Sequence, residues 1–349
     1  MTIPVDVADV TPAWLSEVLG LDVVATEVLD AHSGTTGRAR LALTYGSGSD
    51  GQCPPTLFVK LPPFDEKQRH FVSLAGLGTA EARFYRDVAA GVPMRVPAVL
   101  HADLDDDGGY VMLLEDLEAS GCRFPRPGDD DVVAVVDSII EELANLHAQF
   151  WEHPSLDREL SWVNEGMRIA FGSGARFMQM ALDQFAADMP SVYRQLGELY
   201  VNDSRGIADL WATPPHTLAH GDPHMGNLFV DGTRAGFFDW AMLMRKAGMW
   251  DVAYVICNSV PTEVRRANER AWIAQYREHL ARHGHQLDAD TAWEQYRLYA
   301  VYSWNSAVST AAMGSRFQPE ARAHAAMLRT TTAIEDLDSL ALLEERLRR

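Results

Sequence analysis

Residues 218–255 read LAHGDPHMGNLFVDGTRAGFFDWAMLMRKAGMWDVAYV. Residues 228–230 of this stretch are apolar and predict a β-strand. The Asp-Gly pair at 231–232 is typical of a tight hairpin turn, and residues 236–238 predict the returning strand. The stretch therefore predicts a short hairpin with polar residues at both of its open ends.

Those polar residues are Asn227 and Asp239, twelve positions apart in the chain. Folding the hairpin is expected to bring their side chains together. An amide oxygen beside a carboxylate offers hard oxygen ligands, which suit Mg²⁺, an ion that takes few protein ligands and completes its octahedron with phosphate oxygens and water. Asp222 lies five residues before Asn227, near the expected metal, and is placed to accept a proton from an attacking hydroxyl group.

This order of residues resembles the catalytic loop of kinases, in which an Asp precedes an Asn by five residues and a metal-binding Asp follows on a hairpin. The closer resemblance is to the aminoglycoside phosphotransferase and choline kinase-like superfamily, whose loop reads His-Gly-Asp-x-His-x-x-Asn and whose metal-binding Asp precedes Trp. Residues 220–227 and the Asp-Trp pair at 239–240 match both features. The resemblance runs from about Trp14 to beyond Tyr302 but is specific only near 218–255.

The resemblance implies an α+β, bilobal protein kinase-like fold, with an N-terminal antiparallel sheet lobe and a larger, mainly helical C-terminal lobe. It also implies roles: Asp222 orients and deprotonates the acceptor hydroxyl, Asn227 and Asp239 hold Mg²⁺ on the phosphates, and Asp251 braces the loop. We expect the two histidines of the loop to support its backbone through hydrogen bonds more than to take part in the chemistry.

A kinase also needs a lysine for the phosphates and a glutamate to hold it. Lysine is scarce here, and Lys60 lies in the apolar strand-like run 57–61. Glu81 falls on the packing face of a helix expected at 79–90, where a carboxylate indicates a buried partner. The alternative for Glu81 is a first-turn residue favoured by the helix dipole. The Glu-x-x-Phe-Tyr pattern resembles the corresponding helix of the superfamily and favours an ion pair with Lys60.

The strand expected at 110–114 ends in a segment that resembles the superfamily's adenine-contacting hinge. The resemblance implies that backbone groups of Glu115, Asp116 and Leu117 bind the base of ATP or GTP. No Gly-x-Gly-x-x-Gly loop is present, and residues 33–37 stand in its place. Two interpretations of this segment stay open: a loop that covers the phosphates with backbone N–H groups, or an ordinary hairpin turn.

Composition narrows the class of protein. The chain has 349 residues, 47% of them apolar, and a formal net charge of −19, which makes nucleic-acid binding unexpected. Such acidity attracts a cationic substrate, or it serves solubility alone. The sequence shows neither a membrane-spanning run nor a secretory signal, and its three widely spaced cysteines favour a reducing cytoplasm.

Periodicity predicts the order of the elements. A helix capped by Thr11 and started by Pro12 is followed by strands at 23–29 and 38–45. After residue 115 a long helix begins behind three aspartates, with an apolar stripe at Val132, Val136, Ile139, Leu143, Leu146 and Phe150. We therefore expect a nucleotide-binding lobe over 1–115 and a catalytic and substrate-binding lobe over 116–349.

The sequence thus predicts an enzyme that moves the γ-phosphate of ATP or GTP to the hydroxyl group of a small molecule, with Mg²⁺. The acceptor is open between an aminoglycoside, which needs carboxylates, and an apolar alcohol, which suits the aromatic-rich regions 151–210 and 262–349. The helix and hinge motifs look closer to the choline kinase-like and ecdysteroid kinase-like branch.

Two rival functions remain from the same residues. One is a catalytically silent pseudokinase that binds nucleotide, because intact catalytic residues do not guarantee turnover. The other is a metal-dependent hydrolase, in which His220, Asp222 and His224 form a His-x-Asp-x-His ligand set. The hydrolase interpretation leaves Lys60 and Glu81 without a common purpose.

Overall fold

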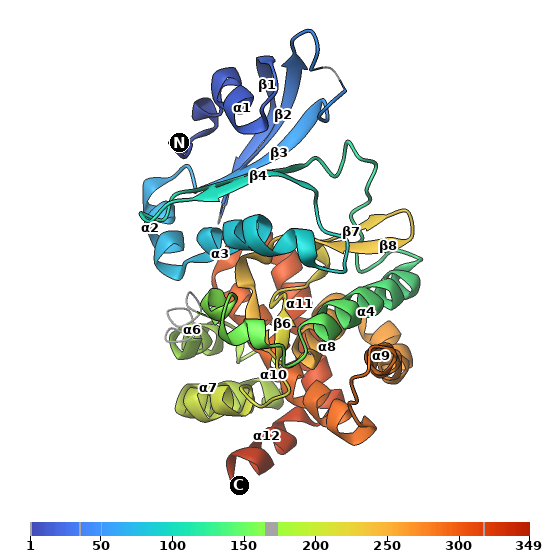
Figure 1. Cartoon of the computed structure of the whole chain (residues 1–349). Coiled ribbons are helices and arrows are strands. Elements are labelled where there is room, and N and C mark those ends of the chain that lie inside the picture. The colour runs from blue at the N-terminus through green and yellow to red at the C-terminus, as the bar shows by residue number, and fades with distance from the viewer. Residues whose placement is uncertain (1, 35, 50, 165–173, 317) are drawn as a thin grey trace. The chain divides into compact units, whose positions relative to one another are not determined.

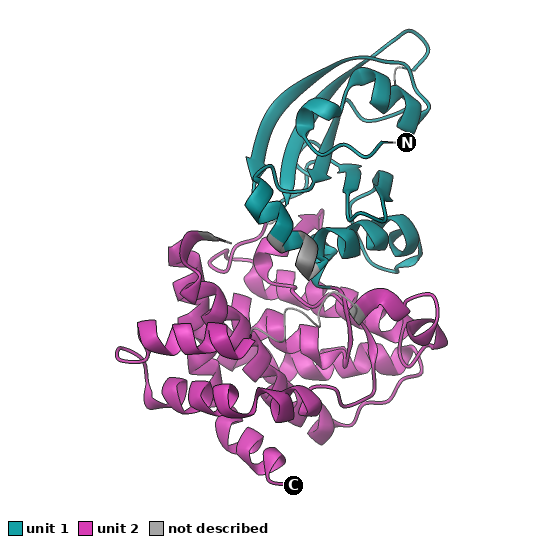
Figure 2. Cartoon of the chain, turned by 90° about the vertical axis from the view of Figure 1, so that its left-hand side faces the viewer, with its two compact units in different colours: residues 1–123, 236–242 teal, residues 124–235, 243–349 magenta. Residues whose placement is uncertain are grey.

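The computed structural model describes residues 2–34, 36–49, 51–164, 174–316 and 318–349. The chain forms two compact units, coloured separately in Figure 2. Unit 1 comprises residues 1–123 and 236–242, and unit 2 comprises residues 124–235 and 243–349. The lobe boundary expected at residue 115 stays a prediction.

Unit 1 is built on a five-stranded antiparallel sheet with the strand order β1-β2-β3-β5-β4 (Figure 1). Its strands are β1 Val23–Ser33, β2 Gly37–Tyr45, β3 Thr56–Leu61, β4 Val99–Leu104 and β5 Tyr110–Glu115. The strands expected from period-two patterning are confirmed, and β1 runs four residues beyond its expected end. The sheet places Lys60 of β3 directly opposite Met112 of β5.

The two faces of this sheet differ in their chemistry. Leu57, Val59 and Leu61 of β3 point to one face and join a buried core with Leu113 and Leu15. Because side chains alternate along a strand, Lys60 points to the opposite face. The alternation therefore separates the hydrophobic core from the face that carries Lys60.

Helix α1 Pro12–Leu19 covers the core face next to β1. Thr11 is its N-cap, with its hydroxyl oxygen accepting from Trp14 N at 3.2 Å, and Pro12 occupies the first turn. Gly20 ends the helix at φ +66°, a conformation that glycine adopts without strain. The expected start of this helix at Thr11 and Pro12 is confirmed.

Helices α2 Glu66–Ala75 and α3 Leu77–Arg83 follow β3. The single helix expected at 79–90 is incorrect in two respects. It begins at Leu77, and after Arg83 the chain continues as a short π-helix, Phe84–Val88, and a short 3-10 helix, Ala89–Gly91. Phe84, the first residue of the π-helix, stacks on the ring of Trp240 at a centroid separation of 3.9 Å.

Unit 2 is mainly helical, and its long helix α10 packs against α6, α8, α11 and α12 (Figure 1). The helices are α4 Val132–Gln149, α6 Gly174–Phe185, α7 Ser191–Leu210, α8 Met249–Tyr254, α9 Thr262–Arg282, α10 Ala289–Ala312, α11 Glu320–Asp336 and α12 Ser339–Leu347. Every residue of the apolar stripe predicted for α4 is buried. No helix among the described residues is both long and apolar enough to cross a membrane.

Two short strand pairs complete the fold. Strand β6 Thr217–Ala219 pairs with β9 Met244–Lys246, and β7 Leu228–Asp231 pairs with β8 Arg234–Phe237. The predicted hairpin is therefore present, with Gly232 at φ +61° in its turn. The predicted fold class, an antiparallel sheet lobe followed by a larger helical lobe, is confirmed.

The buried core of unit 1 gives a first prediction. Leu113 is fully buried in the sheet core, whereas Val28 on β1 is 52% exposed. We expect Leu113→Ala to lower the free energy of unfolding by about 2–5 kcal/mol, because it leaves a cavity in packed surroundings. The matched control Val28→Ala should change it by less than about 1 kcal/mol. Urea unfolding of both variants measures the difference, and equal effects would contradict this assignment of the core face.

Candidate active site

Unit 1 contains a buried ion pair on the face of its sheet that lies opposite the hydrophobic core. Lys60 Nζ lies 2.5 Å from Glu81 Oε2, and the two side chains are 5% and 0% exposed. Strand β3 aims the lysine away from the core, and helix α3 presents the glutamate to it. The structure thus brings together the lysine and glutamate that sequence patterns placed on separate elements.

A third charged group adjoins this pair. Lys60 Nζ donates a hydrogen bond to Asp239 Oδ1 at 3.4 Å. Asp239 has φ +64°, a left-handed conformation in which an Asp is tolerated but uncommon and which recurs at functional sites. The next residue, Trp240, stacks on Phe84 beyond the end of α3, so the segment 236–242 is anchored within unit 1.

These contacts shift the pKa of both Lys60 and Glu81. Burial disfavours the Lys60 ammonium, but the charges of Asp239 and Glu81 outweigh burial and raise its pKa. Burial raises the pKa of Glu81 to about 7, although Lys60 opposes that rise. The lysine is therefore held in its charged form, and the glutamate changes protonation state near neutral pH.

Unit 2 contains the predicted catalytic loop, residues 220–227, which follows β6. The buried carboxylate of Asp251 in α8 accepts hydrogen bonds from His220 N at 2.7 Å and from Gly221 N at 2.9 Å. It also lies 3.2 Å from Nε2 of His147 on α4. One carboxylate thus fixes the start of the loop through two backbone N–H groups, and Gly221 takes φ +86° there.

Asp222 and Asn227 meet inside this loop. Asn227 Nδ2 donates to the Asp222 backbone oxygen at 2.9 Å and to Asp222 Oδ2 at 3.2 Å. Because its amide nitrogen faces Asp222, the Asn227 amide oxygen is directed elsewhere and can act as a ligand. Asp222 keeps part of its side chain, 28%, exposed. Its carboxylate is therefore both positioned and accessible.

The two loop histidines bond to loop backbone, as sequence reasoning favoured. His220 Nδ1 accepts from Asp222 N at 3.3 Å, and His224 Nδ1 accepts from Gly226 N at 3.0 Å. Since Nδ1 of His224 is the acceptor, its neutral ring carries the proton on Nε2. That Nε2 lies 3.7 Å from Asp222 Oδ2. Within the described ranges, no group of three or more His, Cys, Asp or Glu side chains is arranged to hold a metal.

Aromatic residues pack beneath the loop. Tyr302 O–H donates to the Gly221 carbonyl at 3.2 Å, and the Tyr254 hydroxyl is 2.8 Å from Ser306 Oγ. Burial and then the nearby charge of Asp222 raise the pKa of Tyr254 well above its ordinary range. Tyr296, Tyr299 and Trp304, which belong to the aromatic-rich region 262–349, are buried in the helical core. Phe171, another aromatic of the expected acceptor region, lies outside the described residues.

The hinge side chains are engaged in ion pairs of unit 1. Glu115 accepts from Arg95 Nη2 at 2.7 Å, and Asp116 accepts from Arg40 Nη2 at 3.0 Å. The carbonyl of Leu117 accepts from Cys122 N at 2.9 Å. These contacts therefore hold the segment in shape.

Strand β1 ends at Ser33 and β2 begins at Gly37, so the described residues of segment 33–37 lie where these two strands meet. Ser33 pairs with Gly37 in the strand register, and Ser33 Oγ accepts from Phe64 N at 3.0 Å. Gly37 has no room for a side chain, because a Cβ there would lie 2.4 Å from the Phe64 ring. Thr35, which completes the expected phosphate-covering segment, lies outside the described residues.

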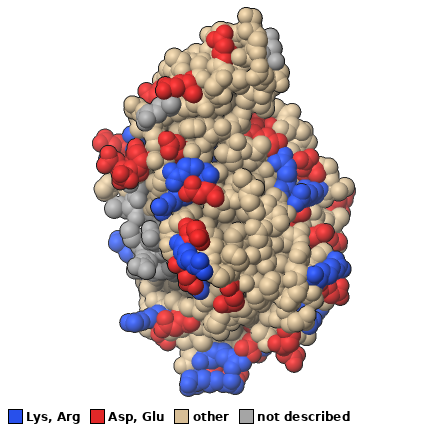
Figure 3. All heavy atoms as spheres, in the orientation of Figure 1, with Lys and Arg blue, Asp and Glu red and all other residues tan. Residues whose placement is uncertain are grey.

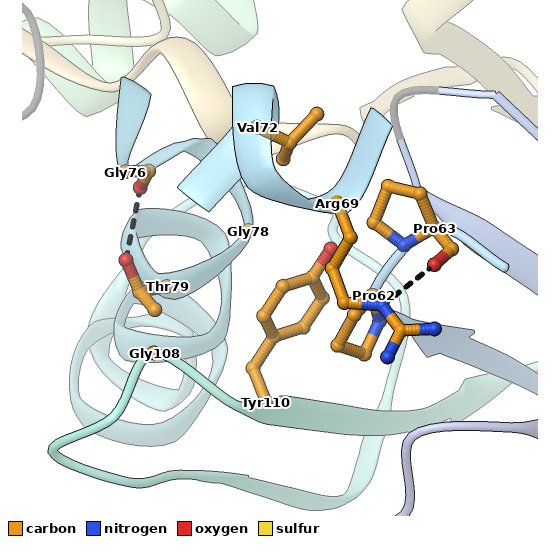
Figure 4. Close-up of a pocket in the computed structure, with 9 residues that line it drawn as sticks. All are labelled: Pro62, Pro63, Arg69, Val72, Gly76, Gly78, Thr79, Gly108 and Tyr110. Carbon is orange, nitrogen blue, oxygen red and sulfur yellow. Dashed lines mark hydrogen bonds between the residues drawn. The ribbon is translucent and has the colours of Figure 1, made fainter. Parts of the chain in front are cut away.

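A small hollow of unit 1 lies beside α3 (Figure 4). Its lining comprises Pro62, Pro63, Arg69, Val72, Gly76, Gly78, Thr79, Gly108 and Tyr110. The Tyr110 ring fills the space that a side chain at Gly78 would need, and its buried hydroxyl makes no hydrogen bond within the described residues. Arg69 Nε donates to the Pro63 carbonyl at 3.0 Å. The hollow reflects the close packing of Tyr110 against α3, the helix that carries Glu81.

Sequence reasoning missed three residues that support the loop. His147 bridges Tyr276 and Asp251, with its Nδ1 2.9 Å from Tyr276 O–H. Ser259 Oγ accepts from Met225 N at 2.9 Å, and Tyr254 lies near Asp222. Only His147 carries a sequence signal: it is a polar residue four positions after Leu143 on the apolar stripe of its helix, where a buried partner is expected.

Comparison with protein families agrees with this arrangement. A model of the phosphotransferase enzyme family (APH) matches residues 40–299, which include Lys60, Glu81, the catalytic loop and Asp251. The chain belongs to this family. A search of curated proteins finds no match.

Solved structures are similar in fold. A choline kinase, LicA, from Streptococcus pneumoniae has a TM-score of 0.53 at 14% identity, over 94% of this chain and 99% of that one. A choline kinase from Cryptosporidium parvum Iowa II has a TM-score of 0.54 at 12% identity, over 91% and 92%. The complex of APH(2″)-IIIa with GDP and kanamycin gives 0.51 at 12% identity, over 94% and 97%. The family member described here therefore has the kinase-like fold that its sequence resembles.

The buried Glu81 predicts a pH dependence. Its folded pKa of about 7 exceeds the ordinary value of 4.5, so its contribution to stability is present below about pH 4.5 and is lost as pH rises through about 7. Lys60, whose pKa is raised, loses its contribution only above its ordinary value of 10.5. We expect Glu81→Gln to remove much of the fall in unfolding free energy between pH 5 and pH 8.

Urea unfolding at the two pH values measures this effect. Glu27→Gln, a substitution of an exposed carboxyl group on β1, is the control and should keep the native pH dependence. An unchanged dependence in Glu81→Gln would show that another group titrates in this range.

The Asp251 network gives a third prediction. In Asp251→Asn one acceptor oxygen becomes an NH₂ group, which faces a buried backbone N–H donor. We expect a loss of about 2–4 kcal/mol in the free energy of unfolding, because a buried donor is left without its acceptor. Asp209→Asn, on the exposed face of α7, is the matched control. Equal stability of the two variants by urea unfolding would refute the bracing role.

Proposed function

We propose that this phosphotransferase moves the γ-phosphate of ATP or GTP to a hydroxyl group of a small molecule, with Mg²⁺. The observation that supports the proposal most is the Asp222 carboxylate, which is held by Asn227 and by the braced loop yet stays partly exposed. Phosphoryl transfer needs little covalent chemistry from a protein and depends on positioning and charge. A fixed carboxylate can position the acceptor, and a buried lysine and oxygen ligands for a cation can offset the charge of the phosphates.

Asp222 is proposed as the catalytic base. Its carboxylate accepts the proton of the acceptor hydroxyl while the hydroxyl oxygen forms a bond to the γ-phosphorus. The bond between that phosphorus and the β,γ-bridging oxygen breaks, and the nucleoside diphosphate leaves with its electron pair. The hydrogen bond from Asn227 Nδ2 to Asp222 Oδ2 keeps the carboxylate in one orientation for this step.

Asn227 and Asp239 are proposed as the protein ligands of Mg²⁺. Their donors fit a hard cation: the Asn227 amide oxygen is turned away from Asp222, and the Asp239 carboxylate is 32% exposed in its unusual backbone conformation. When bound, Mg²⁺ neutralises negative charge on the phosphate oxygens. Lys60, kept charged by its carboxylate neighbours, is proposed to bind phosphate oxygens as well.

The hinge is proposed to bind the nucleotide base through backbone groups of Glu115, Asp116 and Leu117. Within the described part of the chain, the Leu117 N–H makes no hydrogen bond, and it can donate to a base. The similar APH(2″)-IIIa structure contains GDP, whereas the residues here do not distinguish ATP from GTP. Parallel titration with both nucleotides decides between them.

The rival functions predict other outcomes. A pseudokinase binds nucleotide without acceptor-dependent phosphorylation. A hydrolase that uses the His-x-Asp-x-His segment needs ring nitrogens for a metal, but Nδ1 of His220 and of His224 each accepts a backbone N–H. Phosphoryl transfer accounts for the loop and for Lys60 together, so we retain it.

Thermal unfolding with Mg²⁺ and each nucleotide tests the proposal. A magnesium-dependent rise in melting temperature is expected from mass action. We expect Asp239→Ala to lose this magnesium-dependent shift and Asp222→Asn to keep it. Asp222→Asn should nevertheless lower phosphoryl transfer by at least about a hundredfold, because it removes the proton acceptor.

Asp209→Asn serves again as the control for removal of a carboxylate and should behave like the native protein. Full transfer activity in purified Asp222→Asn would exclude it as the base. Absence of any shift with either nucleotide would remove the support for a nucleotide site.

A further inference from the structure

The catalytic loop has a cationic neighbour that sequence motifs do not reveal. Gly226 lies between the His224 ring and Arg322 of α11, since a Cβ built at Gly226 would be 2.7 Å from His224 Cε1 and 3.6 Å from Arg322 Nη1. His224 Nε2 is in turn 3.7 Å from Asp222 Oδ2. Asp222, His224, Gly226 and the Arg322 guanidinium therefore lie in one neighbourhood of unit 2.

A second arginine follows on the same flank of α11. Arg329 lies seven residues after Arg322, two turns or about 10 Å along the helix. Its Nε donates to the Asn258 carbonyl at 2.8 Å, and the adjacent Ser259 binds Met225 N of the catalytic loop. Both guanidinium groups therefore adjoin segments that frame the loop.

Neither arginine has a carboxylate partner within the described part of the chain. Arg322 is exposed and its side chain makes no ion pair or hydrogen bond there. Burial alone lowers the pKa of Arg329. By contrast, Asp336 on the same flank pairs with Arg265 and Arg266. Figure 3 likewise shows many basic side chains lying beside acidic ones on the face in view.

Arg322 is exposed and open to a ligand, whereas Arg329 is partly buried without a counter-charge, which is unfavourable unless it serves another purpose. An oxyanion would supply the missing charge, because carboxylate and phosphate groups match the fork of guanidinium donors. We propose, on the basis of the phosphotransferase function above, that the acceptor is an anionic alcohol. Its hydroxyl group meets Asp222, and its carboxylate or phosphate group binds Arg322, with Arg329 adding positive potential.

The net charge of −19 is no obstacle to such an acceptor. Salt screens exposed charges beyond about 8–10 Å, so recognition depends on the groups nearest the bound molecule. Next to the loop those groups include two unpaired guanidinium groups, which repel an ammonium group. The attraction of cations expected from the overall charge therefore does not extend to this flank.

A matched acceptor panel tests the inference. The native protein with Mg²⁺ and nucleotide is assayed with glycerol, glycerate, glycerol phosphate and the cationic analogue serinol. A second series comprises benzyl alcohol and its carboxylate and aminomethyl derivatives. The readouts are nucleotide consumption above the acceptor-free rate and the phosphorylated product by phosphorus NMR. We expect anionic members to exceed their neutral and cationic counterparts in kcat/KM by about tenfold or more.

Substitutions then assign the preference to the helix flank. Arg322→Gln should raise KM for the best anionic acceptor by about tenfold or more while leaving kcat and the neutral alcohols nearly unchanged. Arg322→Glu should turn the preference toward the cationic member. Arg348→Gln, at the C-cap of α12 with 71% exposure of its side chain, is the matched control. Arg348→Gln should also leave the acceptor-free rate of nucleotide hydrolysis unchanged.

The outcomes separate this inference from the proposed function. If Mg²⁺ and nucleotide stabilise the protein but no anionic member is preferred, the anionic acceptor is wrong and the phosphotransferase proposal stands. If neither nucleotide stabilises the protein, both fail. A preference for glycerate or for glycerol phosphate identifies the oxyanion as carboxylate or phosphate.

Discussion

The Asp251 carboxylate is the constraint on which the catalytic loop depends. It accepts the backbone N–H groups of His220 and Gly221 and contacts His147, so it joins α8, the loop and α4 at one buried point. Backbone donors aimed at one carboxylate restrict the loop more than side-chain packing alone. The orientation of Asp222, and with it the proposed proton transfer, follows from that restriction.

Much of the fold and of the candidate site could be predicted from the preferences of residues that are neighbours in the sequence. Thr11, Pro12 and Gly20 mark helix ends through side-chain and backbone preferences that act within a few residues. The alternation in β3 placed Lys60 away from the core, and the helical phase of Glu81 indicated a buried partner. These features depend on neighbours in sequence, which a single chain displays directly.

Other features depend on contacts between distant segments. The pairing of His147 with Asp251, the stack of Phe84 on Trp240 and the approach of Arg322 to Gly226 each join segments that lie far apart in the sequence. The ion pairs of the hinge carboxylates Asp116 and Glu115 with Arg40 and Arg95 likewise join segments that are separate in the sequence. Tertiary context determines these roles, and sequence spacing does not encode it.

The stack of Trp240 on Phe84 places residues 236–242 in unit 1, while the chain on either side belongs to unit 2. The polypeptide therefore passes between the units three times. A fragment that stops at residue 123 lacks the Asp239 carboxylate that faces Lys60. Neither unit is formed by one continuous segment of the chain. Recombination that exchanges whole lobes between relatives must therefore include residues 236–242 together with residues 1–123. Without them, Lys60 loses the Asp239 carboxylate as an anionic neighbour.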